Sequence, residues 1–197
     1  RVSPDEQMPT VTGVLAGTLN KKMVCLAAKA GLTGVGISLA DGNLAVCDEV
    51  SPILGAVGYP HPRSAKLLHQ LMHANLTPII CPIGSDLNGR LYNVNADQAA
   101  TCISLLLYAD LYLLADVSGV LDENKQVIAQ LDDSKIAYLI HVGGSGDGMI
   151  VKVKAAQEAS KTLGKAVKIG SWNDVGTLVN DPLQNKGTTI ISATIPA

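Results

Sequence analysis

The chain has 197 residues, a length that suits one large domain or two smaller lobes. Hydrophobic residues make up 47% of it and charged residues 16%, with no phenylalanine and one tryptophan, so its core must be built mainly from Leu, Ile, Val and Ala. The net charge of -2 excludes a strong electrostatic attraction to nucleic acid or to an anionic membrane. The sequence contains no uninterrupted apolar run of about eighteen residues, so no transmembrane helix is predicted.

The first half of the chain alternates between helical and strand-like patterns. The predicted elements are a helix over 11–31, a strand over 34–40, a hairpin turn at Asp41-Gly42 into a strand at 44–46, a short strand and loop over 50–59, a break at Pro60-His61-Pro62 before a helix to about 75, and a buried strand over 77–84. In the second helix, His69 and His73 have the spacing of a zinc-binding helix. Because Gln70 stands where the general-base Glu belongs and no third ligand is indicated, we interpret them as part of an exposed helix face.

A polar junction over 93–98 separates a short strand from an almost wholly apolar helix over 99–108. Asn95 is a good N-cap and Gln98 can reach back to its backbone, so capping explains both residues. Capping leaves Asn93 and Asp97 unexplained, and a helix N-terminus, with free N–H groups and a positive dipole end, also suits an anion. Spacing alone leaves a cap and a ligand site as open alternatives.

The second half continues the alternation. The predicted elements are a strand over 110–115, a turn-rich segment from Asp116 to Asp122, helices over 132–141 and 149–163 on either side of a glycine-rich loop over 143–148, and strands over 166–170 and 188–192. Such alternation predicts an α/β fold with a largely parallel sheet covered on both faces, in which ligands collect at the carboxyl ends of the strands.

The glycine-rich loop and the helix after it carry a further candidate. The glycines follow a GxGxG pattern after helix-like sequence, which argues against a dinucleotide site, whereas Asp147 is a plausible N-cap. Lys152 lies in the first turns of this helix, at the unfavourable end of the dipole, with no Asp or Glu three or four residues away. It is either a solvated lysine or a phosphate ligand.

The cysteines indicate the redox environment of the protein. They are widely spaced, lie in apolar surroundings and form no CxxC pair, so we expect Cys25, Cys47, Cys81 and Cys102 to be buried free thiols in a reducing cytoplasm. Residues 1–6 are polar, carry no signal-peptide pattern and lack a starting Met.

Three motifs in this order resemble the amino-acid kinase family, and within it the acetylglutamate kinases. They are Asn93-Val-Asn-Ala-Asp97-Gln-Ala-Ala, Leu114-Ala-Asp116-Val-Ser-Gly119-Val-Leu-Asp122 and Asp147-Gly-Met-Ile-Val-Lys152-Val. The resemblance extends from Arg1-Val2-Ser3-Pro4, which is similar to an Arg-Val-Thr-Pro segment of those enzymes, to Gly187-Thr188. It implies a three-layer αβα sandwich with a mostly parallel central sheet and two lobes, with residues 1–108 as the remainder of the acceptor lobe and 109–197 as the nucleotide-binding lobe.

The resemblance also implies an activity, namely transfer of the ATP γ-phosphoryl group to the side-chain carboxylate of N-acetyl-L-glutamate in arginine biosynthesis. A carboxylate acceptor is already deprotonated at neutral pH, so the reaction needs alignment of two anions and neutralisation of charge and no general base. Mg2+ is expected to bridge the phosphates and not to sit in a cage of protein ligands. The family further implies a homodimer.

By the family pattern, Lys152 would stabilise charge on the transferring phosphoryl group, and Asp97 would hold Lys152 and a second lysine in position. We therefore expect the helix openings beside these two residues to face each other across a gap sized for phosphates. Acetylglutamate would be bound by Arg1, Asn93 and Asn95, with Arg1 gripping a carboxylate through two hydrogen bonds. The nucleotide site would be lined by Asp116, Val117, Ser118, Gly119, Val120, Leu121, Gly144, Ser145 and Gly146.

Two departures from the family pattern affect these expectations. Gly146 stands where related enzymes often have Thr, which would remove one nucleotide contact. The family's Lys-Leu-Gly-Gly strand and a later glycine-rich loop are missing, so we expect a further segment before Arg1 and little catalysis without it. Two alternatives stay open: another family member that phosphorylates glutamate, aspartate, carbamate or a nucleotide, and a noncatalytic nucleotide-binding module.

Overall fold

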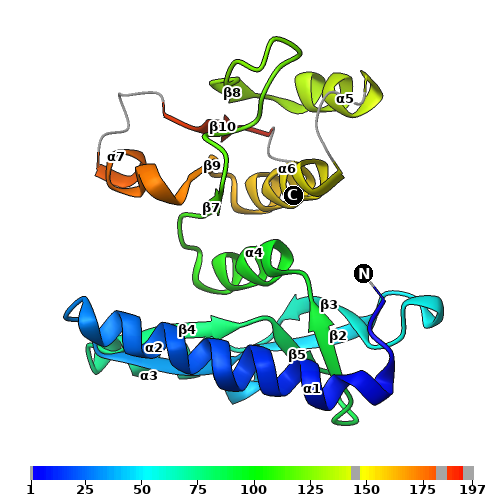
Figure 1. The fold of residues 1–197 in the computed structure, drawn as a ribbon, viewed down its shortest axis with the longest axis vertical. Helices are drawn as coiled ribbons and strands as arrows, with labels where there is room; N and C mark the ends of the chain where they lie inside the picture. Colours follow the sequence, from blue (N-terminus) through cyan, green and yellow to red (C-terminus); the bar gives the residue numbers. More distant parts are fainter. Residues whose placement is uncertain (1, 143–146, 181–185, 193–197) are drawn as a thin grey trace. The chain divides into compact units, whose positions relative to one another are not determined.

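The computed structural model describes residues 2–142, 147–180 and 186–192. The chain divides into two compact units, Arg1–Leu107 and Tyr108–Ala197 (Figure 1), and each has its own buried apolar residues. Both units combine helices with sheets that contain parallel strand pairs, which confirms the predicted α/β class. No helix among the described residues is long and apolar enough to cross a membrane.

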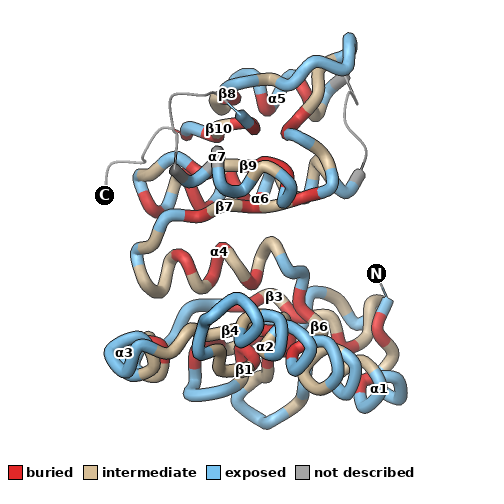
Figure 2. Tube along the Cα trace, turned by 60° about the vertical axis from the view of Figure 1, so that its left-hand side comes forward, coloured by how far each residue is buried: buried red, intermediate tan, exposed pale blue. Residues whose placement is uncertain are grey.

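The N-terminal unit begins with one long helical stretch. It passes through η1 (Asp5–Gln7), α1 (Met8–Thr12), the π-helical η2 (Gly13–Leu19) and α2 (Asn20–Lys29), which confirms the helix predicted over 11–31. Asn20 is the buried residue of α2, and its side-chain amide donates to the backbone carbonyls of Ile37 and Ile79 at 3.3 and 2.8 Å. These hydrogen bonds connect the helix to two strands. Most other residues of α2 are exposed and appear pale blue in Figure 2.

The strands of this unit form two sheets. One is the parallel pair of β1 (Gly34–Ser38) and β4 (Thr77–Cys81), and the other has the order β2-β3-β6-β5. The members of the second sheet are β2 (Ala45–Glu49), β3 (Val57–Pro62), β5 (Ile83–Ser85) and β6 (Leu91–Val94), and the remaining α-helices of the unit are α3 (Lys66–His73) and α4 (Ala96–Leu107). Strands β3 and β6 run parallel, whereas the two outer pairings are antiparallel. Met8 of α1 and Cys102 of α4 join the core of the second sheet.

The hairpin predicted at Asp41-Gly42 is wrong. Residues Asp41–Asn43 form a 3-10 turn, η3, in which the Asp41 carboxylate accepts hydrogen bonds from the backbone N–H and the hydroxyl of Ser38, both at 2.7 Å. The two flanking strands do not pair with each other, because β1 pairs with β4 and β2 pairs with β3. The chain therefore changes sheet at this turn.

The predicted break at Pro60-His61-Pro62 is wrong as well, because these residues lie in β3. Pro60 is opposite Cys47 and Pro62 is opposite Ala45 in the pairing with β2. Strand β3 pairs with β6 only at Val57 and Gly58, so both prolines lie where the strand has a single neighbour. A proline is tolerated there because its missing N–H removes no bond to a second strand.

The C-terminal unit contains a four-stranded sheet in the order β7-β9-β10-β8 among its described residues. Its strands are β7 (Tyr112–Ala115), β8 (Gln130–Leu131), β9 (Val167–Ser171) and β10 (Thr188–Ile190), and its helices are α5 (Asp133–Val142), α6 (Asp147–Leu163), η5 (Trp172–Asp174) and α7 (Val175–Asn180). Strands β7 and β9 are parallel, as are β8 and β10, while β9 and β10 are antiparallel. The strands and helices predicted for this half are confirmed, but β8 and α7 were not predicted.

The four cysteines are free, as expected, but they are not all buried. Cys25 is exposed on α2, so the prediction is wrong for this residue, whereas Cys47, Cys81 and Cys102 are buried. Burial raises the pKa of Cys47 to about 11 and that of Cys102 to about 12, and it also raises the pKa of Cys81. The buried thiols are therefore protonated and unreactive at neutral pH.

Candidate functional site

The polar junction over 93–98 spans the end of β6, the single residue Asn95 and the first turn of α4. The Asn95 side-chain oxygen accepts hydrogen bonds from the backbone N–H groups of Asp97 at 2.9 Å and Gln98 at 3.3 Å. This geometry confirms Asn95 as the N-cap of a twelve-residue helix. Asp97 lies half-buried in the first turn, where the helix dipole favours a negative charge.

Asn93 lies in β6, two residues before the cap, and its side chain has a defined partner. Its Nδ2 donates to the hydroxyl oxygen of Ser3 at 3.0 Å, and its backbone N–H donates to the carbonyl of Ala56 at 2.9 Å. Ser3 is only 3% exposed and pairs with Gly55 through an isolated parallel bridge. Sequence reasoning missed Ser3, although its place in the Arg1-Val2-Ser3-Pro4 segment, where the family carries another hydroxyl residue, was a usable signal.

The predicted nucleotide loop follows β7 directly in the C-terminal unit. Asp116 and Ser118 are exposed, Val117 and Leu121 are half-buried, and Gly119 and Val120 are buried. The loop is anchored to β10, because the backbone N–H of Val120 donates to the hydroxyl oxygen of Thr188 at 2.8 Å. A Cβ atom on Gly119 would lie 2.8 Å from that same oxygen, so only glycine fits at this close approach. The sequence placed Thr188 in a predicted strand but did not reveal its contact with the loop.

Lys152 lies in the second turn of α6 and is half-buried, whereas the neighbouring Lys154 is exposed. Only residues 164–166 separate the end of α6 from β9, and α6 packs against β9 and β10. Since β9 runs parallel to β7, this connection puts the first turns of α6 toward the edge of the sheet where β7 leads into Asp116. The loop after β7 and the first turns of α6, which carry Lys152, therefore lie at the carboxyl edge of these strands.

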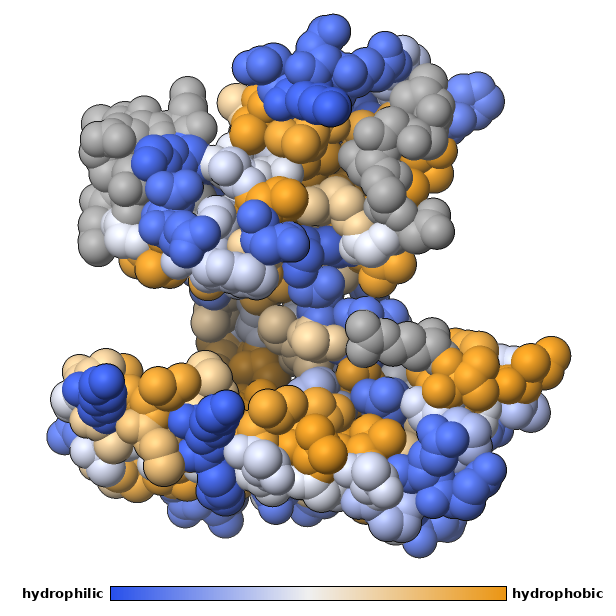
Figure 3. Space-filling view, viewed as in Figure 1, coloured by the Kyte–Doolittle hydropathy of each residue, from blue (hydrophilic) through white to orange (hydrophobic). Residues whose placement is uncertain are grey.

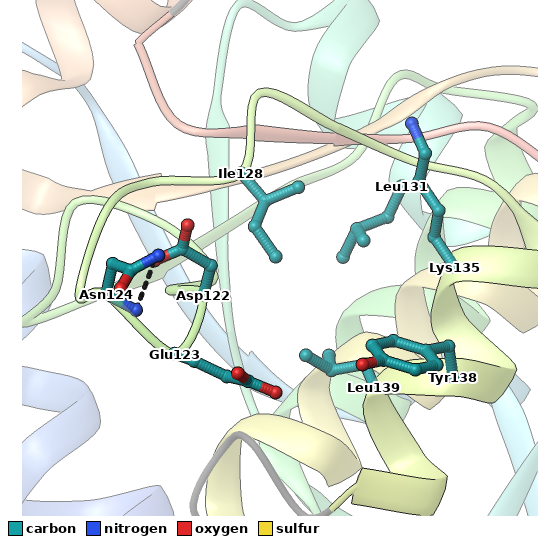
Figure 4. Close-up of a pocket in the computed structure, with 8 residues that line it drawn as sticks. All are labelled: Asp122, Glu123, Asn124, Ile128, Leu131, Lys135, Tyr138 and Leu139. Carbon is teal, nitrogen blue, oxygen red and sulfur yellow. Dashed lines mark hydrogen bonds between the residues drawn. The ribbon is translucent and has the colours of Figure 1, made fainter.

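A cavity of about 280 Å3 lies in the same unit, between the turn that begins at Asp122 and α5 (Figure 4). Its lining combines the apolar side chains of Ile128, Leu131 and Leu139 and the ring of Tyr138 with the polar residues Asp122, Glu123, Asn124 and Lys135. The Asp122 carboxylate closes the turn by accepting from the backbone N–H groups of Asn124 and Gln126 at 2.9 and 2.8 Å. The cavity therefore combines apolar and aromatic side chains with polar groups, as small-molecule sites do.

Several predicted residues lie elsewhere. Arg1 and the loop residues Gly144, Ser145 and Gly146 are outside the described residues. Asp97 and Lys152 belong to different units, so their expected approach stays a prediction. His69 and His73 are exposed on α3, as expected, and within the described part of the chain no three His, Cys, Asp or Glu side chains are grouped to hold a metal ion.

Comparison with known sequences identifies the relatives of the chain. The family description "Amino acid kinase family" matches residues 2–171. An acetylglutamate kinase from Proteus mirabilis (strain HI4320) is 47% identical over 180 residues, which are 91% of this chain and 70% of that protein. Acetylglutamate kinases from Serratia proteamaculans (strain 568) and Aliivibrio fischeri (strain MJ11) are 47% and 46% identical over 90% and 87% of this chain, and the chain covers 69% and 66% of them.

Solved structures agree at the level of the fold. A protein from Streptococcus mutans UA159 has a TM-score of 0.81 at 25% identity, with 97% of this chain and 74% of that chain covered. Carbamate kinase from Giardia lamblia bound to AMP-PNP has a TM-score of 0.65 at 18% identity over the same shares of the two chains, which indicates the fold alone. Together with the family match over most of its length and the relatives at 46–47% identity, this likeness shows that the chain belongs to the amino acid kinase family.

Proposed function

We propose that the protein transfers the γ-phosphoryl group of ATP to the side-chain carboxylate of N-acetyl-L-glutamate, the activity for which its curated relatives are named, as a step of arginine biosynthesis. The observation that carries the proposal is the identity of 46–47% to acetylglutamate kinases over about nine tenths of the chain. An acyl phosphate is formed from two anions, so the protein must align them and neutralise charge.

Lys152 is the residue that we assign to charge neutralisation. It is half-buried near the N-terminus of α6, the end of a helix at which a bound phosphoryl group is favoured. Asp97, in the first turn of α4, would hold Lys152 and a second lysine in position. Mg2+ would bind mainly through the phosphate oxygens, because it keeps much of its water shell and takes few protein ligands.

The two units would share the substrates. We assign N-acetylglutamate to the N-terminal unit, through Asn93, Asn95 and Arg1, and ATP to the C-terminal unit. The loop Asp116–Leu121 and residues 144–146 would contact the nucleotide, and the cavity beside the Asp122 turn would accept the adenine ring, the flat and least polar part of ATP.

A homodimer in the cytoplasm is the assembly that we propose. The long helical stretch of the N-terminal unit carries large apolar side chains that are about half exposed, namely Val14, Leu19, Met23 and Leu26. Figure 3 shows apolar patches over this stretch with hydrophilic residues between them, and exposed apolar patches are typical of an interaction surface. The free thiols are in keeping with a reducing compartment.

The proposal is tested by ATP-dependent hydroxamate formation from N-acetylglutamate, with protein expressed from the complete reading frame. Lys152→Ala should lower turnover about 100-fold or more while nucleotide affinity falls modestly, because the contact strengthens as charge develops in transfer. Lys154→Ala, which removes an exposed lysine from the same helix, is the matched control and should keep full activity. Equal turnover in the two variants would refute the role of Lys152.

A panel of acceptors separates this function from its nearest alternatives. Glutamate, aspartate, carbamate and nucleoside monophosphates are compared with N-acetylglutamate, and a preference for one of them would assign the chain to another activity of the family. Binding of ATP without turnover on any acceptor would instead indicate a noncatalytic nucleotide-binding module.

A further inference from the structure

Arg90 joins three segments of the N-terminal unit that are far apart in the sequence. Its Nε and Nη2 donate to the two carboxylate oxygens of Asp5 at 3.0 and 2.9 Å, and its Nη1 donates to Glu49 at 2.8 Å. The first pair has the parallel, two-bond geometry in which arginine and a carboxylate fix each other's orientation. Arg90 therefore connects η1 and β2 to the start of β6.

The guanidinium is itself held in place. The backbone N–H of Arg90 donates to the Asp86 carboxylate at 2.9 Å, its Nη1 also donates to the Tyr92 hydroxyl at 3.2 Å, and the guanidinium carbon lies 5.0 Å from the centre of the Tyr92 ring. The Arg90 side chain is 35% exposed, so it is partly shielded from water. These contacts restrict the rotamer of Arg90 and make it a fixed anchor for Asp5.

Both residues of the Arg90–Asp5 ion pair are close in sequence to the two partners of the Asn93–Ser3 hydrogen bond. On one side Arg90 is three residues before Asn93, and on the other Asp5 is two residues after Ser3. The Ser3 backbone is bonded to Leu54 and Ala56, at 2.8 and 2.7 Å, and its hydroxyl accepts from Asn93 at 3.0 Å. The four residues thus form a closed ring in which the Arg90–Asp5 pair and the Ser3–Asn93 bond are the two noncovalent links.

We propose that Arg90, acting through Asp5, is a positioning residue for the acceptor. It keeps the Ser3 hydroxyl against the Asn93 amide, so that Asn93 presents one orientation of its amide to the ligand. An amide that rotates freely would have to be ordered by the ligand itself, at a cost in affinity. This inference rests on the proposed function, because it assigns Asn93 to N-acetylglutamate.

Two conservative variants test it on the full-length protein. Asp5→Asn weakens the link toward Ser3, whereas the matched control Glu49→Gln weakens an ion pair between the same guanidinium and β2, which is not part of the ring through Ser3. For Asp5→Asn we expect KM for N-acetylglutamate to rise about three- to tenfold, with KM for ATP and kcat within about twofold of the parent. Glu49→Gln should leave all three constants unchanged.

Amide exchange at Ala56 gives a second readout that does not depend on activity. Its N–H donates to the Ser3 carbonyl, so exchange should quicken in Asp5→Asn and not in Glu49→Gln. An active parent with equal acceptor KM in both variants would overturn this inference and leave the proposed function intact. If the unmodified protein forms no hydroxamate, the proposed function is overturned. If amide exchange at Ala56 is then also equal in Asp5→Asn and Glu49→Gln, the inferred connection from Arg90 through Asp5 to Ser3 is overturned as well.

Discussion

A single hydroxyl on β10 holds the loop that we assign to the nucleotide. Thr188 is 1% exposed and accepts the backbone N–H of Val120, which is itself fully buried. A buried N–H without an acceptor costs about 1–3 kcal/mol, so the shape of the loop depends on this bond.

Substitution of this hydroxyl should therefore affect stability and nucleotide binding together. Thr188→Val keeps the volume but leaves the Val120 N–H without its acceptor, and we expect a loss of about 1–3 kcal/mol in the free energy of unfolding and a several-fold rise in KM for ATP. Thr188→Ser keeps the acceptor and is the control. Urea unfolding and initial-rate kinetics measure both effects, and indistinguishable Val and Ser variants would contradict the prediction.

The buried cysteines predict how stability depends on alkaline pH. Burial holds the pKa of Cys47 at about 11 and of Cys102 at about 12, above the ordinary value of 9.0, because the folded state disfavours the thiolate. The thiols of the unfolded chain ionise near pH 9, so this contribution to stability is fully present below pH 9 and is lost as pH rises through about 11 to 12.

We therefore expect Tm to fall more steeply between pH 9 and 11 in the parent than in a Cys47→Ala/Cys102→Ala variant. Comparison of the two slopes removes the effect of all the groups that the two proteins share. Cys25→Ser changes an exposed thiol and should keep the slope of the parent. Parallel slopes in all three proteins would show that Cys47 and Cys102 do not contribute.

At the scale of the elements, α4 owes its start to one side chain. Replacement of the Asn95 cap by Ala should cost about 1 kcal/mol, or a few degrees in Tm for a chain of this size. Asn95→Asp keeps a capping oxygen and should keep the stability, so thermal unfolding of the two variants separates a lost cap from a nonspecific effect of substitution. A stable Ala variant would mean that the two bonds to the cap do not start the helix.

The elements that the sequence predicts well are those decided by local interactions. The apolar run of α4, its cap at Asn95 and the helix that carries Lys152 all depend on residues within a few positions of one another. The pairing of β1 and β2 depends instead on strands elsewhere in the chain, so the Asp41-Gly42 signal could not reveal it. Likewise, the apolar neighbours of Cys25 do not tell which side of α2 faces the solvent.

The residues of the candidate site also differ in whether they could be predicted from local sequence. Asn93, Asp97, Asp116 and Lys152 could be proposed because each lies in a short motif. Thr188 and the partner of Arg90 could not, since their contacts join residues 68 and 85 positions apart. Ser3 lies in a segment that carried a signal, but its contact with Asn93 spans 90 positions and was missed. Groups that would contact the substrate are thus easier to predict from the sequence than the groups that hold them in place.

At the scale of the whole molecule, the proposed reaction needs groups from both units. Asp97 lies in Arg1–Leu107 and Lys152 in Tyr108–Ala197. A carboxylate beside a phosphoryl group is repulsive unless a cation lies with it, so we expect Asp97 to act through lysines and not directly on the substrate. This expectation makes the effects of the two residues dependent on each other.

A double-mutant cycle on the full-length protein measures that dependence. If Asp97 orients Lys152, Asp97→Asn should lower kcat/KM much less in a Lys152→Ala background than in the parent, because the group that it orients is already gone. The remaining effect reports on the second lysine that Asp97 would also hold. Asp97→Asn combined with Lys154→Ala is the control, and there the two effects should multiply. If the losses of kcat/KM caused by Asp97→Asn and Lys152→Ala also multiply in the double variant, the two residues act independently. That result would contradict a shared site for the transferred phosphoryl group.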